Sequence, residues 1–425
     1  MTIYEMLKLP TDSIARSDGI GKKILDNFKR NLFLYFIHHE DISQKYECKP
    51  NHFPSLYLTD PPSKDCNIIG ETMKSLLTTL ILILFCLPMC SPNKKIEACK
   101  ITWEARSSGT NTSFRGLSVV NKSVVWASGS NGTIARTING GKTWQTDTIP
   151  GATSLDFRDI EAFDENTAIV ICAGRPAKIF KTVDGGKNWD EKYSNDSEGI
   201  FFNSMAFWDA ENGIAVGDPI DGYFMIIITA DSGENWIQVP SENISPALPG
   251  EANFAASGTC IAIEGRDKVW FGTGGSVARV FYSADRGRSW NVAHTPVISG
   301  SASMGIFSLA FYDEKNGIVV GGDYINPTVK VKNAAITKDG GLTWTLIAES
   351  VQPNGYRSCV AYLPNTSGRK LLAVGITGTD ISFNSGHTWA NIDTVGYHSI
   401  GFASSDAYGW AVGADGRIAK LIDNQ

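Results

Sequence analysis

Three arginines stand at one recurring position of the sequence, where together they could bind an anion. The chain contains repeated short apolar segments. Arg115, Arg158 and Arg357 each lie five residues before the apolar residue that ends one of them, which is Val120, Phe163 or Tyr362. Tyr397 occupies that position in another segment, and His398 follows it. Guanidinium groups donate paired hydrogen bonds to carboxylates and phosphates. We therefore expect this basic and aromatic group to bind a carboxylate, a phosphate or an acidic protein segment.

A structural explanation of the same arginines stays open. Each guanidinium could instead pair with a nearby acid such as Asp156 or Asp159, and surface ion pairs of that kind are common and contribute little to stability. Arg175 lies in a neighbouring loop and is predicted to extend the basic group.

Three acids are further candidates for the same region. Asp218 and Asp323 follow glycines that end apolar segments, and Glu251 lies in a long connection, 241–257, which is predicted to fold over the site. Residues 323–332 form a second insertion. Long ordered loops often carry function. Because glycoside hydrolysis needs two carboxyl groups that face each other across the bond, a glycosidase is the alternative to a binding site.

Other chemistries have no support in the sequence. The glycines at 272–275 are not followed by a helical pattern, which a dinucleotide-binding loop requires. The cysteines show no metal-ligand spacing. We therefore expect no metal and no cofactor. The net charge of −6 gives no reason to expect a nucleic-acid partner.

A repeated octamer predicts the elements that position these residues. Its frame is Ser/Thr-x-Asp/Asn-x-Gly-x-Ser/Thr/Asn-Trp, and its six copies begin 45 to 54 residues apart. The copies are Thr137–Trp144, Thr182–Trp189, Thr229–Trp236, Ser283–Trp290, Thr337–Trp344 and Ser382–Trp389. A period of this length indicates a repeated supersecondary unit, as in a propeller.

Each residue type in the octamer has a structural reason. The Asp or Asn accepts hydrogen bonds from N–H groups of its own turn. The Gly permits a positive φ, and the Trp begins the next strand and buries a large surface. We therefore assign structural roles to the third and last residues of the copies, which are Asn139, Asp184, Asp231, Asp285, Asp339 and Asn384, and Trp144, Trp189, Trp236, Trp290, Trp344 and Trp389.

Each period contains four short apolar segments, which predict the four antiparallel strands of a propeller blade. The last period stops after three of them. Ile101–Trp103 carries the Thr-Trp pair that closes an octamer, and it precedes the first complete period. We therefore predict an all-β, seven-bladed β-propeller over 101–425, whose last blade is completed by the N-terminal strand through Trp103. Such closure protects the strand edges.

The order of blades places the candidate residues on one face. The start of each innermost strand and the loop between the second and third strands lie on one side of a propeller, and the octamers lie on the other. Blades 6, 7, 1 and 2 are neighbours in a closed ring. The three arginines, Tyr397 and His398 are therefore predicted to form an arc at the mouth of the central channel.

The octamer resembles the Asp-box, or BNR repeat, of sialidases, sortilin-like receptors and photosystem II assembly factors. The nearest likeness is to the photosystem II stability and assembly-factor group, which implies a non-catalytic scaffold that binds a protein partner or an anionic ligand. Sialidases use an arginine triad with a Tyr/Glu pair, and the residues that could take those roles are Arg115, Arg158, Arg357, Tyr397 and Glu251. The sialidase Arg-Ile-Pro motif is absent, because Phe114-Arg-Gly-Leu117 stands in its place.

The segment before the propeller predicts export. Residues 73–90 contain a methionine, a lysine, an apolar run and Cys90, as in the signal of a bacterial lipoprotein that is lipidated on its cysteine. The apolar run is too short for an ordinary spanning helix. Residues 91–100 are predicted to be a linker. Residues 1–72 are predicted to be a non-native or disordered extension, with a cytoplasmic segment and an uncleaved anchor as the alternative. We expect a monomer in the periplasm or at the cell surface, attached to the membrane.

Overall fold

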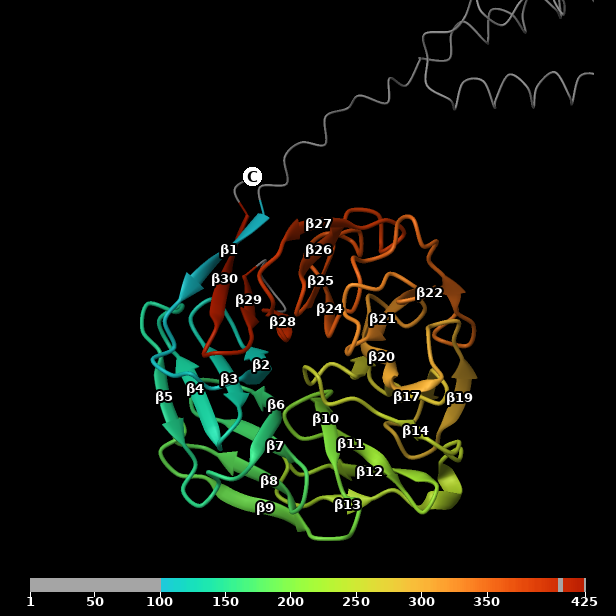
Figure 1. The fold of residues 1–425 in the computed structure, drawn as a ribbon. Coiled ribbons are helices and arrows are strands. Elements are labelled where there is room, and N and C mark those ends of the chain that lie inside the picture. Colours follow the sequence, from blue (N-terminus) through green and yellow to red (C-terminus); the bar gives the residue numbers. More distant parts are fainter. Residues whose placement is uncertain (1–100, 404–407, 424–425) are drawn as a thin grey trace, which may run out of the picture. The chain divides into compact units, whose positions relative to one another are not determined.

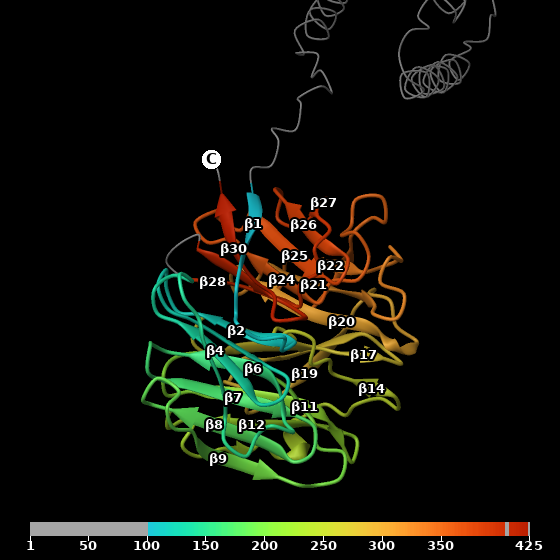
Figure 2. The ribbon, with the colours of Figure 1, turned by 60° about the vertical axis from the view of Figure 1, so that its left-hand side comes forward.

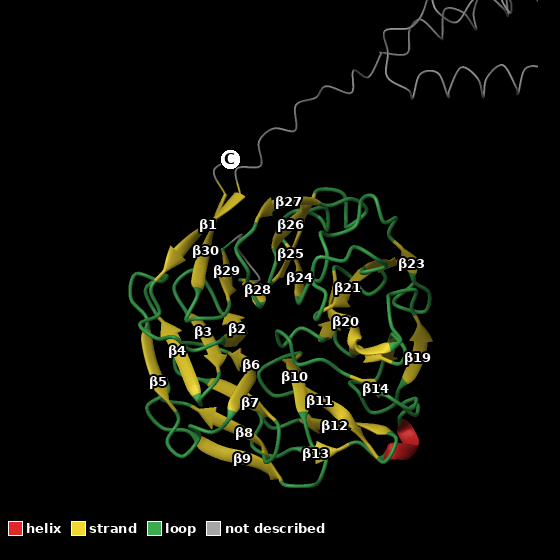
Figure 3. Cartoon of the chain, in the orientation of Figure 1, coloured by secondary structure: helices red, strands yellow, loops and turns green. Residues whose placement is uncertain are grey.

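The computed structural model describes residues 101–403 and 408–423. These residues form strands β1 to β30 and one short 3-10 helix, η2 (Ser241–Asn243). Figure 3 shows how far the strands dominate this part of the chain. The segments predicted at 1–72, 73–90 and 91–100, including Cys90, lie outside it. No helix in the described ranges is long and apolar enough to cross a membrane.

Seven antiparallel sheets are arranged as a ring around a common centre (Figure 1). Blade 1 consists of β2 (Phe114–Val119), β3 (Val125–Gly129), β4 (Thr133–Thr137) and β5 (Gln145–Thr148). Blade 2 consists of β6 (Asp156–Ala162), β7 (Ala168–Ala173), β8 (Ala177–Thr182) and β9 (Asp190–Asn195). Blade 3 consists of β10 (Phe202–Phe207), β11 (Gly213–Ile220), β12 (Tyr223–Thr229) and β13 (Ile237–Gln238).

The ring continues with blade 4, which consists of β15 (Ile261–Glu264), β16 (Lys268–Gly272), β18 (Arg279–Ser283) and β19 (Asn291–His294). Blade 5 consists of β20 (Ser301–Phe311), β21 (Gly317–Asp323), β22 (Ala334–Thr337) and β23 (Thr345–Leu346), and two short strands extend its sheet: β14 (Glu251–Ala252) and β17 (Gly274–Gly275). Blade 6 consists of β24 (Cys359–Tyr362), β25 (Leu371–Gly375), β26 (Gly378–Ser382) and β27 (Ala390–Asp393). Blade 7 consists of β28 (Ser399–Phe402), β29 (Gly409–Val412), β30 (Ile418–Asp423) and β1 (Ile101–Arg106).

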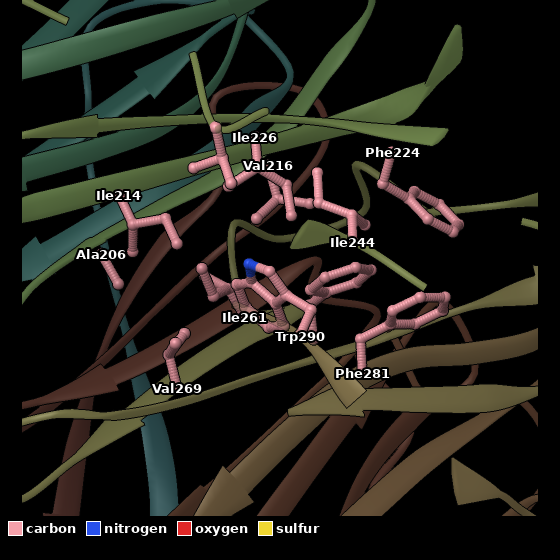
Figure 4. Close-up of a cluster of buried hydrophobic side chains, with 12 residues drawn as sticks. Ala206, Ile214, Val216, Phe224, Ile226, Ile244, Ile261, Val269, Phe281 and Trp290 are labelled. Carbon is pink, nitrogen blue, oxygen red and sulfur yellow. The ribbon is translucent and has the colours of Figure 1, made fainter. Parts of the chain in front are cut away.

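Neighbouring blades bury apolar side chains between them. The cluster between blades 3 and 4 joins Val216 and Ile226 to the rings of Phe271, Phe281 and Trp290 (Figure 4). The Phe271 and Phe281 rings are stacked 4.7 Å apart, and the Trp290 ring meets Phe271 edge-on. Middle strands are covered on both faces by adjacent blades, which explains why they read as nearly continuous apolar runs.

The six octamers form hydrogen-bonded turns between the third and fourth strands of blades 1 to 6. In blade 2, Asp184 Oδ1 accepts hydrogen bonds from the Asn188 N–H at 2.9 Å and from the Thr182 hydroxyl at 3.0 Å. The Thr182 Oγ1 accepts the Gly186 N–H at 3.0 Å. The hydrogen bonds from Asn188 lower the pKa of Asp184 to about 2. The Asp-box residues thus satisfy the polar groups of their own turns.

The N-terminal strand closes the ring, as the sequence predicts. β1 pairs with β30, so that Trp103 lies opposite Leu421, and both views show the two strands side by side (Figure 1 and Figure 2). Trp103 Nε1 donates a hydrogen bond to Thr379 Oγ1 of blade 6 at 3.0 Å, and its ring contacts Tyr397. The seven-bladed, all-β prediction is confirmed.

Replacing Trp103 by Ala is expected to weaken this closure. The variant loses a half-buried ring and its hydrogen bond to blade 6, and we expect the free energy of unfolding to fall by about 2–3 kcal/mol. Urea denaturation measures the change, and limited proteolysis between β1 and β2 reports opening of the ring. An unchanged unfolding midpoint together with unchanged protease resistance would show that Trp103 does not hold the blades together.

Candidate functional site

A pocket of about 450 Å³ lies where the innermost strands begin, on the face opposite the Asp-box turns. We call it the mouth pocket. It is lined by Arg115, Arg158, Phe201, Asn203, Asp218, Ala252, Asn253, Phe254, Ala255, Ala256, Phe307, Tyr324, Tyr356, Ile376 and His398. These residues come from blades 1, 2, 3, 5, 6 and 7 and from the connection that follows blade 3.

A bulge in the innermost strands turns side chains into this pocket. The pairing register shifts in β2, β6, β10 and β20, and the residues at the shifts are Arg115, Arg158, Asn203 and Phe307. All four line the mouth pocket. Because a bulge leaves one residue outside the ladder and re-aims its side chain, the same backbone feature supplies the wall of the pocket from four blades.

The connection after blade 3 folds across the centre of the ring, as predicted. We call Asn253–Ser257 the plug segment. Arg158 Nη1 donates to the Ala255 carbonyl at 2.8 Å, and Arg115 Nη1 donates to the Ala256 carbonyl at 3.1 Å. The Ser257 hydroxyl donates to the Ser358 carbonyl at 2.7 Å. The segment thus forms the floor of the pocket and is held by blades 1, 2 and 6.

The two arginines of the pocket differ in their charge partners. Arg158 forms an ion pair with Asp156 at 2.6 Å. Within residues 101–403 and 408–423, Arg115 has no carboxylate at ion-pair distance, and its one hydrogen bond goes to the neutral Ala256 carbonyl. Burial, followed by repulsion from Arg158, lowers the pKa of Arg115, which still stays charged at neutral pH. The pocket therefore carries at Arg115 a positive charge that has no direct ion-pair partner among the described residues.

His398 adds a ring nitrogen without adding charge at neutral pH. Burial and the nearby Arg115 and Arg158 lower the pKa of His398 to about 3. Its Nε2 lies 3.5 Å from the Ser113 hydroxyl. The imidazole is therefore neutral at pH 7 and can donate one hydrogen bond to an anion beside Arg115.

Asp218 is the acidic member of the pocket. Its Oδ1 accepts hydrogen bonds from Asn203 Nδ2 at 3.1 Å and from the Asn253 N–H at 3.0 Å. Burial raises the pKa of Asp218 from 3.8 to about 6. Among the described residues that line the pocket, Asp218 is the one carboxylic acid.

The raised pKa predicts how stability depends on pH. Between about pH 4 and pH 6 the folded chain holds a proton on Asp218 that the unfolded chain has lost, so this group makes the fold more stable as the pH falls through that interval. Asp218→Asn keeps an Oδ1 acceptor and removes the titration. We expect wild type to lose up to about 3 kcal/mol more than the variant when the pH rises from 4 to 7.

Urea unfolding of both proteins at several pH values measures this difference. Glu161, whose pKa burial raises to about 7, is present in both and cancels in the comparison. Parallel stability curves for wild type and Asp218→Asn would contradict the assignment.

The structure does not bring every predicted residue to the pocket. Arg357 is fully buried between blades and pairs with the buried Asp380, with Nη2 and Oδ2 2.7 Å apart. Tyr397 is buried in the core shared by blades 6 and 7. Arg175 is exposed and pairs with Asp196. The expected arc at the mouth is thus reduced to Arg115, Arg158 and His398.

Two of the predicted acids support loops instead. Glu251 is buried, pairs with Arg279 and accepts a hydrogen bond from the Thr273 hydroxyl at 2.6 Å. Asp323 Oδ1 accepts the Ile325 N–H at 3.0 Å, and its Oδ2 accepts from Asn326 Nδ2 at 2.8 Å. Both carboxylates are occupied by groups of the chain itself, and neither lines the pocket.

Sequence reasoning missed the aromatic side of the pocket. Phe254 stacks on Phe307 with ring centroids 4.1 Å apart, and Tyr356 and Tyr324 meet Phe307 edge-on. Two of these rings come from the long connection and the blade 5 insertion, which were singled out only for their length. Each of those two loops carries a single aromatic residue, so nothing in the sequence indicated that these rings would meet.

The fold has known counterparts. The family model of the photosynthesis system II assembly factor YCF48 matches residues 153–264, which span blades 2 and 3 and the start of blade 4. A structure of YCF48 bound to a D1 peptide aligns with a TM-score of 0.54 at 17% identity, and covers 75% of this chain and 96% of that one. YCF48 from Cyanidioschyzon merolae aligns with a TM-score of 0.55 at 15% identity, and covers 76% and 99%. The chain is therefore similar to YCF48 in its propeller fold.

An enzyme shares the same architecture. The GH74 xyloglucanase from Xanthomonas campestris aligns with a TM-score of 0.52 at 14% identity, and the alignment covers 75% of this chain but only 53% of the enzyme. No curated protein sequence matches the chain significantly. At these identities the structural likenesses show the fold, and the chemistry has to be argued from the mouth pocket.

Proposed function

We propose that this YCF48-like propeller is a non-catalytic scaffold that holds a partner protein by an acidic segment placed in the mouth pocket. The observation that carries the proposal is the half-buried guanidinium of Arg115, which has no direct ion-pair partner among the described residues and lies in a pocket lined by aromatic rings. A charged donor in such a setting gains more from a carboxylate than an exposed arginine does, because water screens it less.

The pocket offers a carboxylate several partners. Within 101–403 and 408–423, Arg115 donates a hydrogen bond through Nη1 alone, so its Nε and Nη2 groups remain for a ligand. His398 and the edges of the aromatic rings flank the same space. The plug segment contributes Asn253–Ala256 to the lining, so a ligand in the pocket also contacts this segment. A side chain with a carboxylate and a short stem fits this arrangement.

The similar proteins support a binding role. One of the solved structures with this fold is YCF48 bound to a D1 peptide, so a propeller of this kind can hold a protein segment. A glycosidase is less well supported, because Asp218 is the one carboxylic acid among the lining residues and glycoside hydrolysis uses two. The xyloglucanase that shares the fold is also a much longer chain.

We also propose that the chain works as a monomer outside the cytoplasm, attached to the membrane by a lipid on Cys90. The support is the order of residues in 73–90, a lysine followed by an apolar run and a cysteine. Mass spectrometry of the mature chain, and its distribution between membrane and soluble fractions for wild type and Cys90→Ala, test this proposal. A chain that begins upstream of residue 73 and carries no lipid would contradict it.

Affinity capture with the full chain tests the binding role. Wild type, Arg115→Gln and the control Arg175→Gln are compared, since Arg175 is an exposed arginine with its own acidic partner outside the pocket. We expect partners that are retained by wild type and the control and lost with Arg115→Gln. Identical partners for all three proteins would overturn the proposal.

A further inference from the structure

Exposed apolar side chains flank the mouth pocket on blades 5 and 6. Tyr324, Ile325 and Val329 belong to the insertion between β21 and β22, and Ile376 lies in the turn between β25 and β26. Their exposed fractions are 46%, 66%, 42% and 47%. Tyr324 and Ile376 also line the mouth pocket. We call these four residues the apolar rim, which is continuous with the pocket.

The insertion holds its exposed side chains in place. The Asp323 carboxylate fixes the turn through the Ile325 N–H and the Asn326 amide. The Pro327 carbonyl accepts the Tyr356 N–H at 2.9 Å, and the Lys332 carbonyl accepts the Ile298 N–H at 2.8 Å. A loop ordered in this way has already lost most of its conformational freedom, so binding to it costs less entropy.

Three exposed apolar residues of the Asp-boxes are distributed differently. Ile138, Val183 and Phe383 each occupy the second position of an Asp-box, one to a blade, on the face opposite the pocket. Single exposed apolar side chains are ordinary on protein surfaces. The rim differs because its members are grouped beside a pocket, which is typical of a protein interaction site.

We infer that the apolar rim and the mouth pocket form one continuous site for an amphipathic segment of the partner protein. The segment places an acidic side chain against Arg115 and lays neighbouring apolar side chains on Ile325 and Val329. Lys330 and Lys332, which are exposed on the insertion, favour further acidic residues along it. This inference rests on the proposed function, and it adds the chemistry of the partner.

A peptide fits these observations better than a lipid bilayer. Arg115 is half-buried in the lining of the mouth pocket, so an anion has to enter the pocket to reach it. A side chain that extends from a peptide can do so while its neighbours stay on the rim. A bilayer presents its charges in a broad layer and would contact the lysines of the insertion first.

Selection from a random-peptide display library on the immobilised full chain tests the inference. Four proteins are compared: wild type, Arg115→Gln, the rim variant Ile325→Ser with Val329→Ser, and the control Val183→Ser, whose side chain is exposed on the opposite face. We expect wild type and the control to enrich peptides with an acidic residue flanked by apolar residues. The rim variant should bind these peptides about tenfold more weakly and still enrich acidic ones.

The outcomes separate the two proposals. Acidic peptides that need Arg115 but bind the rim variant as tightly as wild type would overturn the rim and leave the proposed function standing. A lack of acidic enrichment on wild type would overturn both. Binding to phosphatidylglycerol vesicles that is lost in the rim variant, without enrichment of acidic–apolar peptides, would assign the rim to a membrane and also overturn the inference.

Discussion

Arg357→Met is expected to lower the free energy of unfolding by about 3–5 kcal/mol, because it leaves the Asp380 carboxylate charged and without its ion-pair partner inside the protein. Both side chains of the pair are almost fully buried, and Arg357 Nε also donates to Asp380 Oδ2 at 2.9 Å. The Arg357 Nη1 group further donates to the Tyr356 carbonyl and the Thr377 hydroxyl. One substitution therefore disturbs a network that joins the start of blade 6 to its third strand.

The urea denaturation midpoints of three further variants show whether the broken ion pair causes this loss of stability. Arg175→Met breaks an exposed pair and should change the stability by less than about 1 kcal/mol. Asp380→Asn combined with Arg357→Met removes the unpaired buried carboxylate and should recover much of the lost stability. Asp380→Asn alone should remain destabilised, because Arg357 then has no ion-pair partner. A drop below about 1 kcal/mol for Arg357→Met would mean that the pair does not support the blade.

Arg115→Gln is expected to weaken binding of the acidic partner segment by about 10- to 100-fold, since a hydrogen bond between charged groups contributes about 1.5–3 kcal/mol. The effect of Arg158→Gln should be smaller, because Asp156 already neutralises Arg158. Isothermal titration of the full chain with a selected acidic peptide measures both. Equal losses for the two variants would contradict the view that Arg115 carries the free charge.

Two controls keep this result interpretable. Arg115 donates to the plug segment through the Ala256 carbonyl, so the unfolding midpoint of each variant must be compared with wild type. Arg115→Lys keeps the charge and loses the paired donors, and we expect intermediate affinity. A lysine variant that binds as weakly as glutamine would indicate that the geometry of the guanidinium matters more than its charge.

The ring and its closure could be read from the sequence because the Asp-box repeats in register. The octamers fix where the third strand ends and the fourth begins, and Trp103 identifies the strand that completes blade 7. These features are local, and the hydrogen bonds within each turn depend on few other residues. The long connection 241–257 was also recognised as the cover of the channel.

The candidate site was predicted only in part, and the reason is a shift of one residue. The residue that opens the hairpin after each innermost strand is Val120 in blade 1 and Phe163 in blade 2, and the sequence alignment used both. In blades 3, 5, 6 and 7 the hairpin opens at Trp208, Tyr312, Leu363 and Ala403. Each of these residues comes one position after the apolar residue that the sequence comparison of the blades took as the end of the strand. Two adjacent apolar residues cannot be told apart by hydropathy alone.

That shift explains which residues were misplaced. Counted from the correct hairpin residues, the counterparts of Arg115 are Asn203, Phe307, Ser358 and His398. Arg357 and Tyr397 instead match Phe114, which is fully buried, and they lie in the core. A slip of one residue in a strand moves every side chain to the other face. The buried partner Asp380 could not be identified either, since it comes from the third strand of the blade.

Hydrogen–deuterium exchange of the full chain, with and without a saturating acidic peptide, tests the central claim most directly. The claim is that the partner is held at the mouth of the ring and not at the Asp-boxes. We predict slower exchange in the plug segment, in residues 323–332 and in the loop that precedes β24, with unchanged exchange in the Asp-box turns. Protection confined to the Asp-box turns or to the outer strands, with none at the mouth, would contradict the account.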